Sequence, residues 1–98
     1  MPKLHNPETD LLFEGILKLE TVEECYRFFT DICTIKELQD ISQRLEIALL
    51  LSGGKSYQEI AAAVGASTAT IGRVNKCLAY GSGGYKAAIE KLSETEEA

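Results

Sequence analysis

The side chains best suited to binding chemistry lie between Ser67 and Leu78. A helix turns by about 100° per residue. A helix over this segment would place its small and basic residues on a single face. These residues are Ala69, Gly72, Arg73 and Lys76, with Thr68 and Thr70 beside them. Cationic and hydroxyl groups can bond phosphates or base edges, and small residues let another backbone approach. The segment therefore predicts a helix that reads double-stranded DNA.

A second short helix must hold this one in place. Ser56 and Glu59 have the spacing of a capping box, in which each side chain satisfies a free backbone N–H group. An apolar stripe follows, and Gly65 then ends the helix where a positive φ is usually needed. Ser67 caps the next helix, whose inner face carries Ile71, Val74 and Leu78. Two helices joined by a glycine turn predict a helix-turn-helix, with Ser67–Leu78 in the major groove. Gln58 and Ser67 complete its candidate DNA contacts.

Other functions for the same hairpin stay open. The bland interpretation is a pair of helices that only pack, and the alternative function is a protein–protein interaction module. An enzyme is not expected, because His5 is the single histidine and no catalytic pair is visible. Cys25, Cys33 and Cys77 lack a C-x-x-C spacing, so we expect free thiols, no metal site and no cofactor.

Charge is unevenly distributed along the chain. The net charge of the 98 residues is −5, but residues 41–92 hold six basic and three acidic groups. The half with the helix-turn-helix is thus the positive half, and local charge matters most within a Debye length of about 8–10 Å. A net charge this small favours specific binding over strong nonspecific binding, and a dimer would double it.

The remaining segments predict an all-α fold of about six helices in a single domain, residues 1–98. Residues 1–6 are expected to form a loose arm, and residues 93–98 a solvated acidic tail. Capping boxes at Thr21 and Thr34 predict two further helix starts, and a first helix should run from Asn6-Pro7 to about Leu19.

Three further expectations concern the ends of the chain and its burial. The run Ile47–Leu51 is apolar all round, which indicates a helix central to the fold or to a dimer. The last helix is expected over Lys86–Leu92, with Ala87, Ala88 and Leu92 inward. No apolar run is long enough to span a bilayer and no signal peptide is visible, so we expect a cytoplasmic protein without a membrane partner.

The chain resembles the Trp repressor superfamily, and most of all its YerC/YecD branch. The resemblance is carried by Gly65–Arg73 (G-A-S-T-A-T-I-G-R), by Leu50–Ile60 and by R-L-E-I-A-L-L in the third helix. It covers roughly residues 20–92 and implies a DNA-binding repressor that forms an intertwined homodimer.

The resemblance also implies a candidate ligand pocket. The family's repressor clamps tryptophan between two arginines, and Arg44 and Arg73 stand at the matching places. A glycine that makes room for the indole is Val74 here, and a serine that binds the ligand amine is Cys77. L-tryptophan is therefore not expected as a strong corepressor. The arginine pair could bind another small-molecule effector, or simply bond carbonyls and phosphates.

Overall fold

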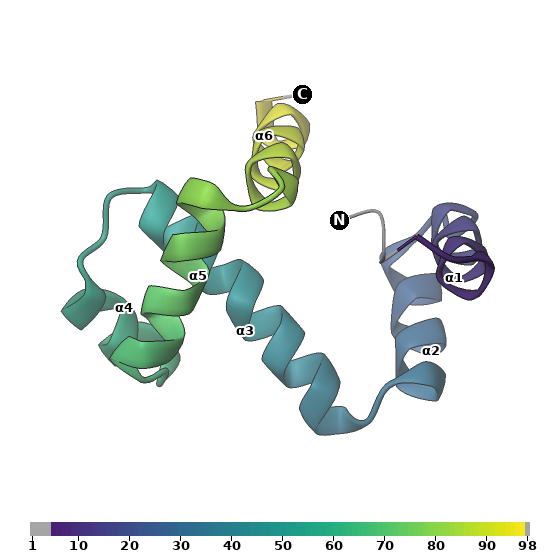
Figure 1. The fold of residues 1–98 in the computed structure, drawn as a ribbon, viewed down its shortest axis with the longest axis horizontal. Helices are drawn as coiled ribbons and strands as arrows, with labels where there is room; N and C mark the ends of the chain where they lie inside the picture. Colours follow the sequence, from purple (N-terminus) through teal and green to yellow (C-terminus); the bar gives the residue numbers. More distant parts are fainter. Residues whose placement is uncertain (1–4, 98) are drawn as a thin grey trace. The chain divides into compact units, whose positions relative to one another are not determined.

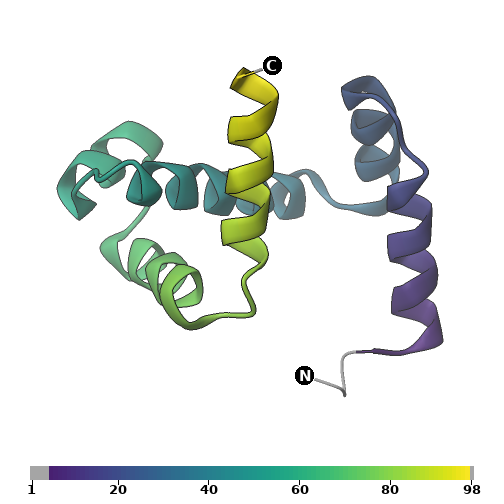
Figure 2. The same cartoon turned by 90° about the horizontal axis from the view of Figure 1, so that it is seen from above.

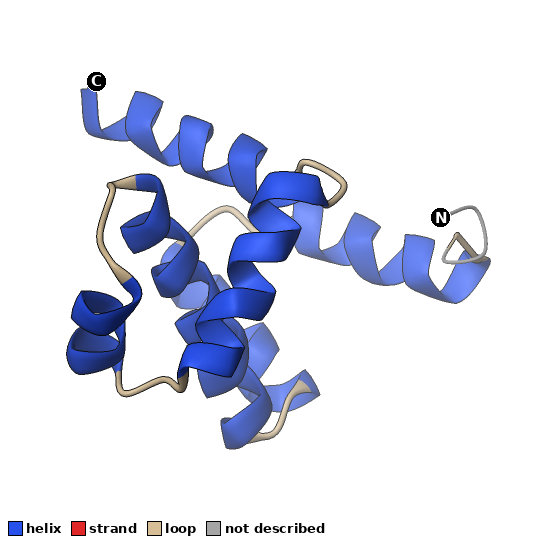
Figure 3. Ribbon diagram, turned by 60° about the vertical axis from the view of Figure 1, so that its left-hand side comes forward, coloured by secondary structure: helices blue, strands red, loops and turns tan. Residues whose placement is uncertain are grey.

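The computed structural model describes residues 5–97, with their side chains as far as Glu94, and this part of the chain forms six helices and no strand (Figures 1 and 3). The helices are α1 (Pro7–Leu17), α2 (Val22–Ile32), α3 (Ile35–Ser52), α4 (Tyr57–Val64), α5 (Thr68–Tyr80) and α6 (Gly84–Glu97). The predicted all-α class is confirmed. The chain divides between Leu38 and Gln39 into two compact units, and the predicted loose arm lies outside the described residues up to position 4.

The helix starts predicted for α1 to α5 are confirmed by side-chain caps. The side chain of Asn6 accepts from the N–H group of Thr9 at 2.8 Å, and Pro7 is the first residue of α1. At α4, Ser56 Oγ accepts from Glu59 N at 3.1 Å and Glu59 Oε1 accepts from Ser56 N at 2.8 Å. Thr34 and Glu37 form the same reciprocal pair at α3. Each pair satisfies two N–H groups that have no partner within the helix.

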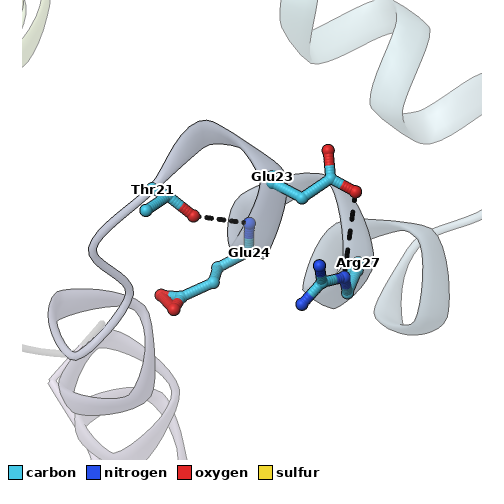
Figure 4. A network of polar contacts seen from close by, with 4 residues as sticks. All are labelled: Thr21, Glu23, Glu24 and Arg27. Atoms are coloured by element: carbon cyan, nitrogen blue, oxygen red, sulfur yellow. Dashed lines mark hydrogen bonds and ion pairs between the residues drawn. The ribbon is translucent and has the colours of Figure 1, made fainter.

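The start of α2 differs from the prediction in one hydrogen bond. Thr21 Oγ1 accepts from Glu24 N at 3.0 Å, as expected (Figure 4). The carboxylate of Glu24, however, accepts from the N–H group of Glu20 at 2.7 Å rather than from that of Thr21. Arg27 Nε lies 3.8 Å from a carboxylate oxygen of Glu23. Figure 4 marks this exposed ion pair, which is of a kind that contributes little to stability.

The first unit leaves much apolar surface uncovered. Neither α1 nor α2 contains a fully buried residue, and α1 ends at Leu17 rather than near Leu19. Leu11 is 70% exposed, Leu17 81% and Val22 74%. The adjacent rings of Phe28 and Phe29 meet edge to face with centroids 5.4 Å apart. Burial of such side chains is the main driving force of folding, so this surface is suited to a partner.

The second unit has a small core drawn from three helices. Five side chains are between 0% and 2% exposed: Ile47 and Ala48 of α3, Ile60 of α4, and Ile71 and Val74 of α5. Tyr85 and Ile89 of α6 pack against this cluster. The backbone of α5 runs close to both α4 and α6, and Figure 2 shows the short turn between α5 and α6.

Several predicted boundaries and faces in this unit are wrong. Helix α5 continues to Tyr80 rather than Leu78, and α6 runs from Gly84 to Glu97, so residues 93–97 are helical. Ala88 is half-buried as predicted, but Ala87 and Leu92 are exposed. Tyr85 and Ile89 pack against the core instead. Along α3, Ile35, Ile41 and Leu49 remain exposed in the chain, and of the run Ile47–Leu51 only Ile47 and Ala48 are fully buried.

No helix among the described residues is long and apolar enough to cross a membrane.

The capping box of α4 predicts a pH-dependent contribution to stability. Hydrogen bonds from the backbone and side chain of Ser56, with a smaller effect of the Lys55 charge, hold the pKa of Glu59 below its ordinary value. A depressed pKa in the folded state means that the carboxylate stabilises the fold above its ordinary pKa, and that this contribution is lost as pH falls through the folded value.

We therefore expect Glu59→Gln to destabilise the protein at about pH 7 and to do so much less at about pH 3. Urea unfolding of the variant and the unchanged protein at both pH values measures the difference. A free-energy difference that stays the same across this range would contradict the capping role of the ionised carboxylate.

Candidate nucleic-acid interface

The turn between α4 and α5 has the geometry that its sequence predicts. Gly65 has φ of +71°, a left-handed conformation that non-glycine residues adopt only at a cost, and its N–H donates to Ala61 O. Ala66 is half-buried and packs against the core. Ser67 then caps α5, its Oγ accepting from Thr70 N at 3.1 Å. The turn thus fixes where α5 begins while its buried face joins the core.

The outward face of α5 is open. Ala69, Arg73 and Lys76 are exposed, and Gly72 is half-exposed. A Cβ atom built on Gly72 would meet no atom within 4 Å. Packing within the chain therefore gives no reason for glycine here, although glycine in a helix costs about 1 kcal/mol relative to alanine. The small side chain is consistent with the close approach of another molecule.

Two hydroxyl groups at the start of α5 are hydrogen-bonded to each other. Ser67 Oγ accepts from Thr70 N and also donates to Thr70 Oγ1, at 3.1 Å in each case. The hydroxyl proton of Ser67 is thereby used inside the chain. Thr70 Oγ1 accepts this hydrogen bond, and the Thr70 side chain is half-buried. Thr68, like Gln58 in the first turn of α4, is exposed.

The electrostatics of α5 differ from those of the four preceding helices. Each of α1 to α4 has an acidic residue in its first turn, where a carboxylate offsets the positive end of the helix dipole. The first turn of α5 has none. Its free N–H groups and positive end therefore remain available to an anion, and phosphate is a favourable one. Arg73 and Lys76 add positive charge along the same helix.

The four residues of the predicted ligand pocket lie in two environments. Arg44 on α3 and both Arg73 and Cys77 on α5 are exposed. Val74 is buried among Ile47 and the other core residues, so its branched side chain already fills space inside the fold. The structure records no contact that joins the four.

Among the described residues no group of three or more histidine, cysteine, aspartate or glutamate side chains could hold a metal ion. A shallow hollow runs along α2 instead, lined by Glu23, Tyr26, Arg27, Thr30 and Asp31.

Two residues near this interface were not predicted. Tyr80 is 87% exposed, and eleven residues after Ala69 it returns to the same side of α5, about 20° away. The sequence pattern predicts a helix end at Leu78, so Tyr80 was not expected on this face. Gln43 of α3 donates from Nε2 to Val64 O, 3.2 Å away, across 21 residues of sequence. No local spacing signals a partner so distant.

Comparison with known proteins gives consistent matches over nearly the whole chain. The family model described as Trp repressor protein matches residues 7–93. The uncharacterized protein YerC of Bacillus subtilis (strain 168) is 52% identical over 94 residues, which cover 96% of this chain and 90% of YerC. Both matches include α4, the turn and α5.

Two crystal structures are also similar. A TrpR-like protein from Eubacterium eligens ATCC 27750 superposes with a TM-score of 0.91 at 45% identity, covering 95% of this chain and 96% of that chain. A candidate Trp repressor from Staphylococcus aureus gives a TM-score of 0.90 at 43% identity, with 94% of this chain and 92% of that chain covered.

Proposed function

The chain belongs to the Trp repressor family of DNA-binding regulators, and from this premise we propose that it is a sequence-specific transcriptional repressor whose α5 reads the major groove. The observation that carries the proposal is the outward face of α5, where Ala69, Arg73 and Lys76 are exposed and a Cβ atom at Gly72 would meet open space. The major groove is about 12 Å wide and admits a helix.

Position along α5 suggests how the contacts divide. Residues near the start of a recognition helix approach base edges, whereas cationic groups further along bond the flanking phosphates. Thr68, Ala69, Thr70 and Gly72 lie in the first turns, and the small ones bring the helix backbone close to the bases. At about 1.5 Å per residue, Arg73 lies roughly 6 Å and Lys76 roughly 10 Å beyond Ala69. Gln58 is assigned to the phosphate backbone at the edge of the contact. Ser67 is assigned to it through the backbone N–H group, since its hydroxyl already donates to Thr70.

We also propose that the chain acts as a homodimer, with both units of each chain serving one helix-turn-helix domain. The apolar side chains left open on α1, on α2 and on α3 at Ile35 and Ile41 support this, because a second copy is a partner of matching chemistry. A dimer places two copies of α5 on one DNA site and doubles the positive charge available to phosphates.

L-tryptophan is not part of the proposal. Val74 is packed in the core, and forcing a ring into space that a stiff β-branched side chain occupies costs about 1–3 kcal/mol. Arg44, Arg73 and Cys77 remain candidate contacts for a different small-molecule effector. Micromolar binding of L-tryptophan in a calorimetric titration, with tighter DNA binding, would count against this assignment.

Arg73→Ala tests the DNA-binding proposal. Selection from a random DNA pool first identifies a bound sequence. On that sequence the variant should lose about 1–3 kcal/mol of binding free energy, because Arg73 is placed to bond a phosphate or a base. Affinity is measured over a range of salt concentrations, with thermal unfolding as a check on the fold.

Arg27→Ala is the matched control, since Arg27 is also an exposed arginine but lies on α2. It should leave DNA affinity nearly unchanged.

Selection that enriches no DNA sequence would refute the proposed function, and capture of a protein instead would favour the protein-interaction alternative. Enrichment with equal affinity for both variants would remove Arg73 from the contact.

Gly72→Ala should change stability and binding in opposite directions. The added methyl group meets open space, so the free energy of unfolding should rise by about 0.5–1 kcal/mol. The same methyl group stands between the helix and the groove, so DNA affinity should fall. Gly15→Ala in α1 is the control, because its Cβ also meets no atom within 4 Å. It should stabilise the fold without weakening DNA binding, and equal affinity for both variants would contradict the close approach at Gly72.

The dimer proposal predicts that stability depends on protein concentration. A folded state that includes subunit association gains from mass action, so the unfolding midpoint should rise with concentration. Sedimentation should give a dimer at micromolar concentration. A cooperative, folded monomer under those conditions would rule out an obligate dimer.

A further inference from the structure

Gln43 joins α3 to the end of the first helix of the helix-turn-helix. Its side-chain amide donates from Nε2 to Val64 O at 3.2 Å, in a partly buried position. Val64 is the last residue of α4, and Gln43 lies in the middle of α3. The bond therefore connects a long helix to the point at which the chain leaves α4 and enters the turn.

The acceptor is a group that needs a partner. The last four carbonyl groups of a helix have no partner within the helix, and Val64 O is the final one of α4. The N–H group of Gly65 satisfies an earlier carbonyl, that of Ala61, at 2.9 Å. Gln43 satisfies the carbonyl that directly precedes the turn. An eight-residue helix is not stable alone, so its ends depend on such contacts.

The apolar contacts between α3 and the helical pair are less directional. Gln43 is four residues before Ile47 and therefore on the same side of α3, at the edge of the core. Ile47 meets Ile60, Ile71 and Val74 through apolar contacts, which depend on area buried and only weakly on direction. A hydrogen bond requires a particular distance and angle. The amide can thus fix the position of the turn where apolar packing alone would allow small shifts.

We infer that Gln43 is a positioning residue for DNA binding: through Val64 O it sets the turn Gly65–Ser67 and so the direction in which α5 presents its outward face. Gln43 itself touches no DNA. The inference rests on the proposed function. It means that a residue of α3 helps to set the orientation of α5. A change at this bond would shift the first turn of α5, where the base contacts are assigned.

Gln43→Met tests the inference, because methionine has similar length and no N–H group. We expect DNA affinity to fall by about 3–10-fold, the change that loss of one hydrogen bond produces. In the free protein the backbone amide signals of residues 66–70 should shift in NMR spectra. Gln43→Glu, which also lacks the donor at neutral pH but stays polar, should change both readouts in the same direction and serves if the methionine variant folds poorly.

Thr34→Ala is the control for general destabilisation. It removes the cap of α3, where Thr34 Oγ1 accepts from Glu37 N at 3.1 Å, without touching α4 or the turn. It should lower the thermal midpoint as a lost hydrogen bond does, yet keep DNA affinity and the amide signals of residues 66–70.

The outcomes separate the inference from the proposed function. If the Gln43 variants bind as tightly as the unchanged protein, or if Thr34→Ala loses as much affinity, Gln43 does not position α5. If the unchanged protein selects no DNA, the proposed function fails. The amide signals then still show whether Gln43 sets the turn, and unmoved signals would overturn the inference.

Discussion

The burial of five apolar side chains, from α3, α4 and α5, is the interaction on which the helix-turn-helix depends. Ile47 and Ala48 pack α3 against the helical pair α4 and α5. Ile60, Ile71 and Val74 form the buried face of that pair. Because these residues use up the inner sides of α4 and α5, the polar and small residues of α5 are left on the outside. A core this small leaves most other apolar side chains of the described chain partly or fully exposed. The surface proposed for DNA and the surface proposed for a second copy thus have one cause, which is the small number of side chains that the chain can bury in its own core.

Placement of charge follows a similar logic. Carboxylates at the first turns of α1 to α4 offset the positive ends of these helices, and the reciprocal Ser56–Glu59 pair also caps α4. Helix α5 does without such a carboxylate and relies on the neutral cap of Ser67. An acidic residue there would stabilise the helix but repel a phosphate.

The sequence predicted features that depend on near neighbours. Capping residues such as Asn6, Thr34 and Ser56 bond a backbone group three residues away, so the local sequence is enough to predict them. The positive φ of Gly65 is likewise a property of that one residue. The end of α6 was missed because Ser93 and Glu94 are tolerated in helices and no glycine or proline stops the chain there.

Features that depend on distant partners were harder to predict. Whether Ile41 or Leu49 is buried depends on which helix covers it, which a periodic pattern does not specify. The bond from Gln43 to Val64 O has no signature in composition or spacing. The candidate DNA residues could nevertheless be grouped from the sequence, because nearly all of them lie on one helix and the helical period places them on one face.

The three free thiols differ in exposure, which allows one of them to be labelled selectively. Cys25 and Cys33 are half-buried, whereas Cys77 is exposed on α5, four residues and so about one turn after Arg73. A thiol-reactive fluorophore or spin label should consequently react fastest at Cys77. A probe attached there would sit beside the proposed contact face without replacing a core residue, and its signal would report directly on occupancy of that face.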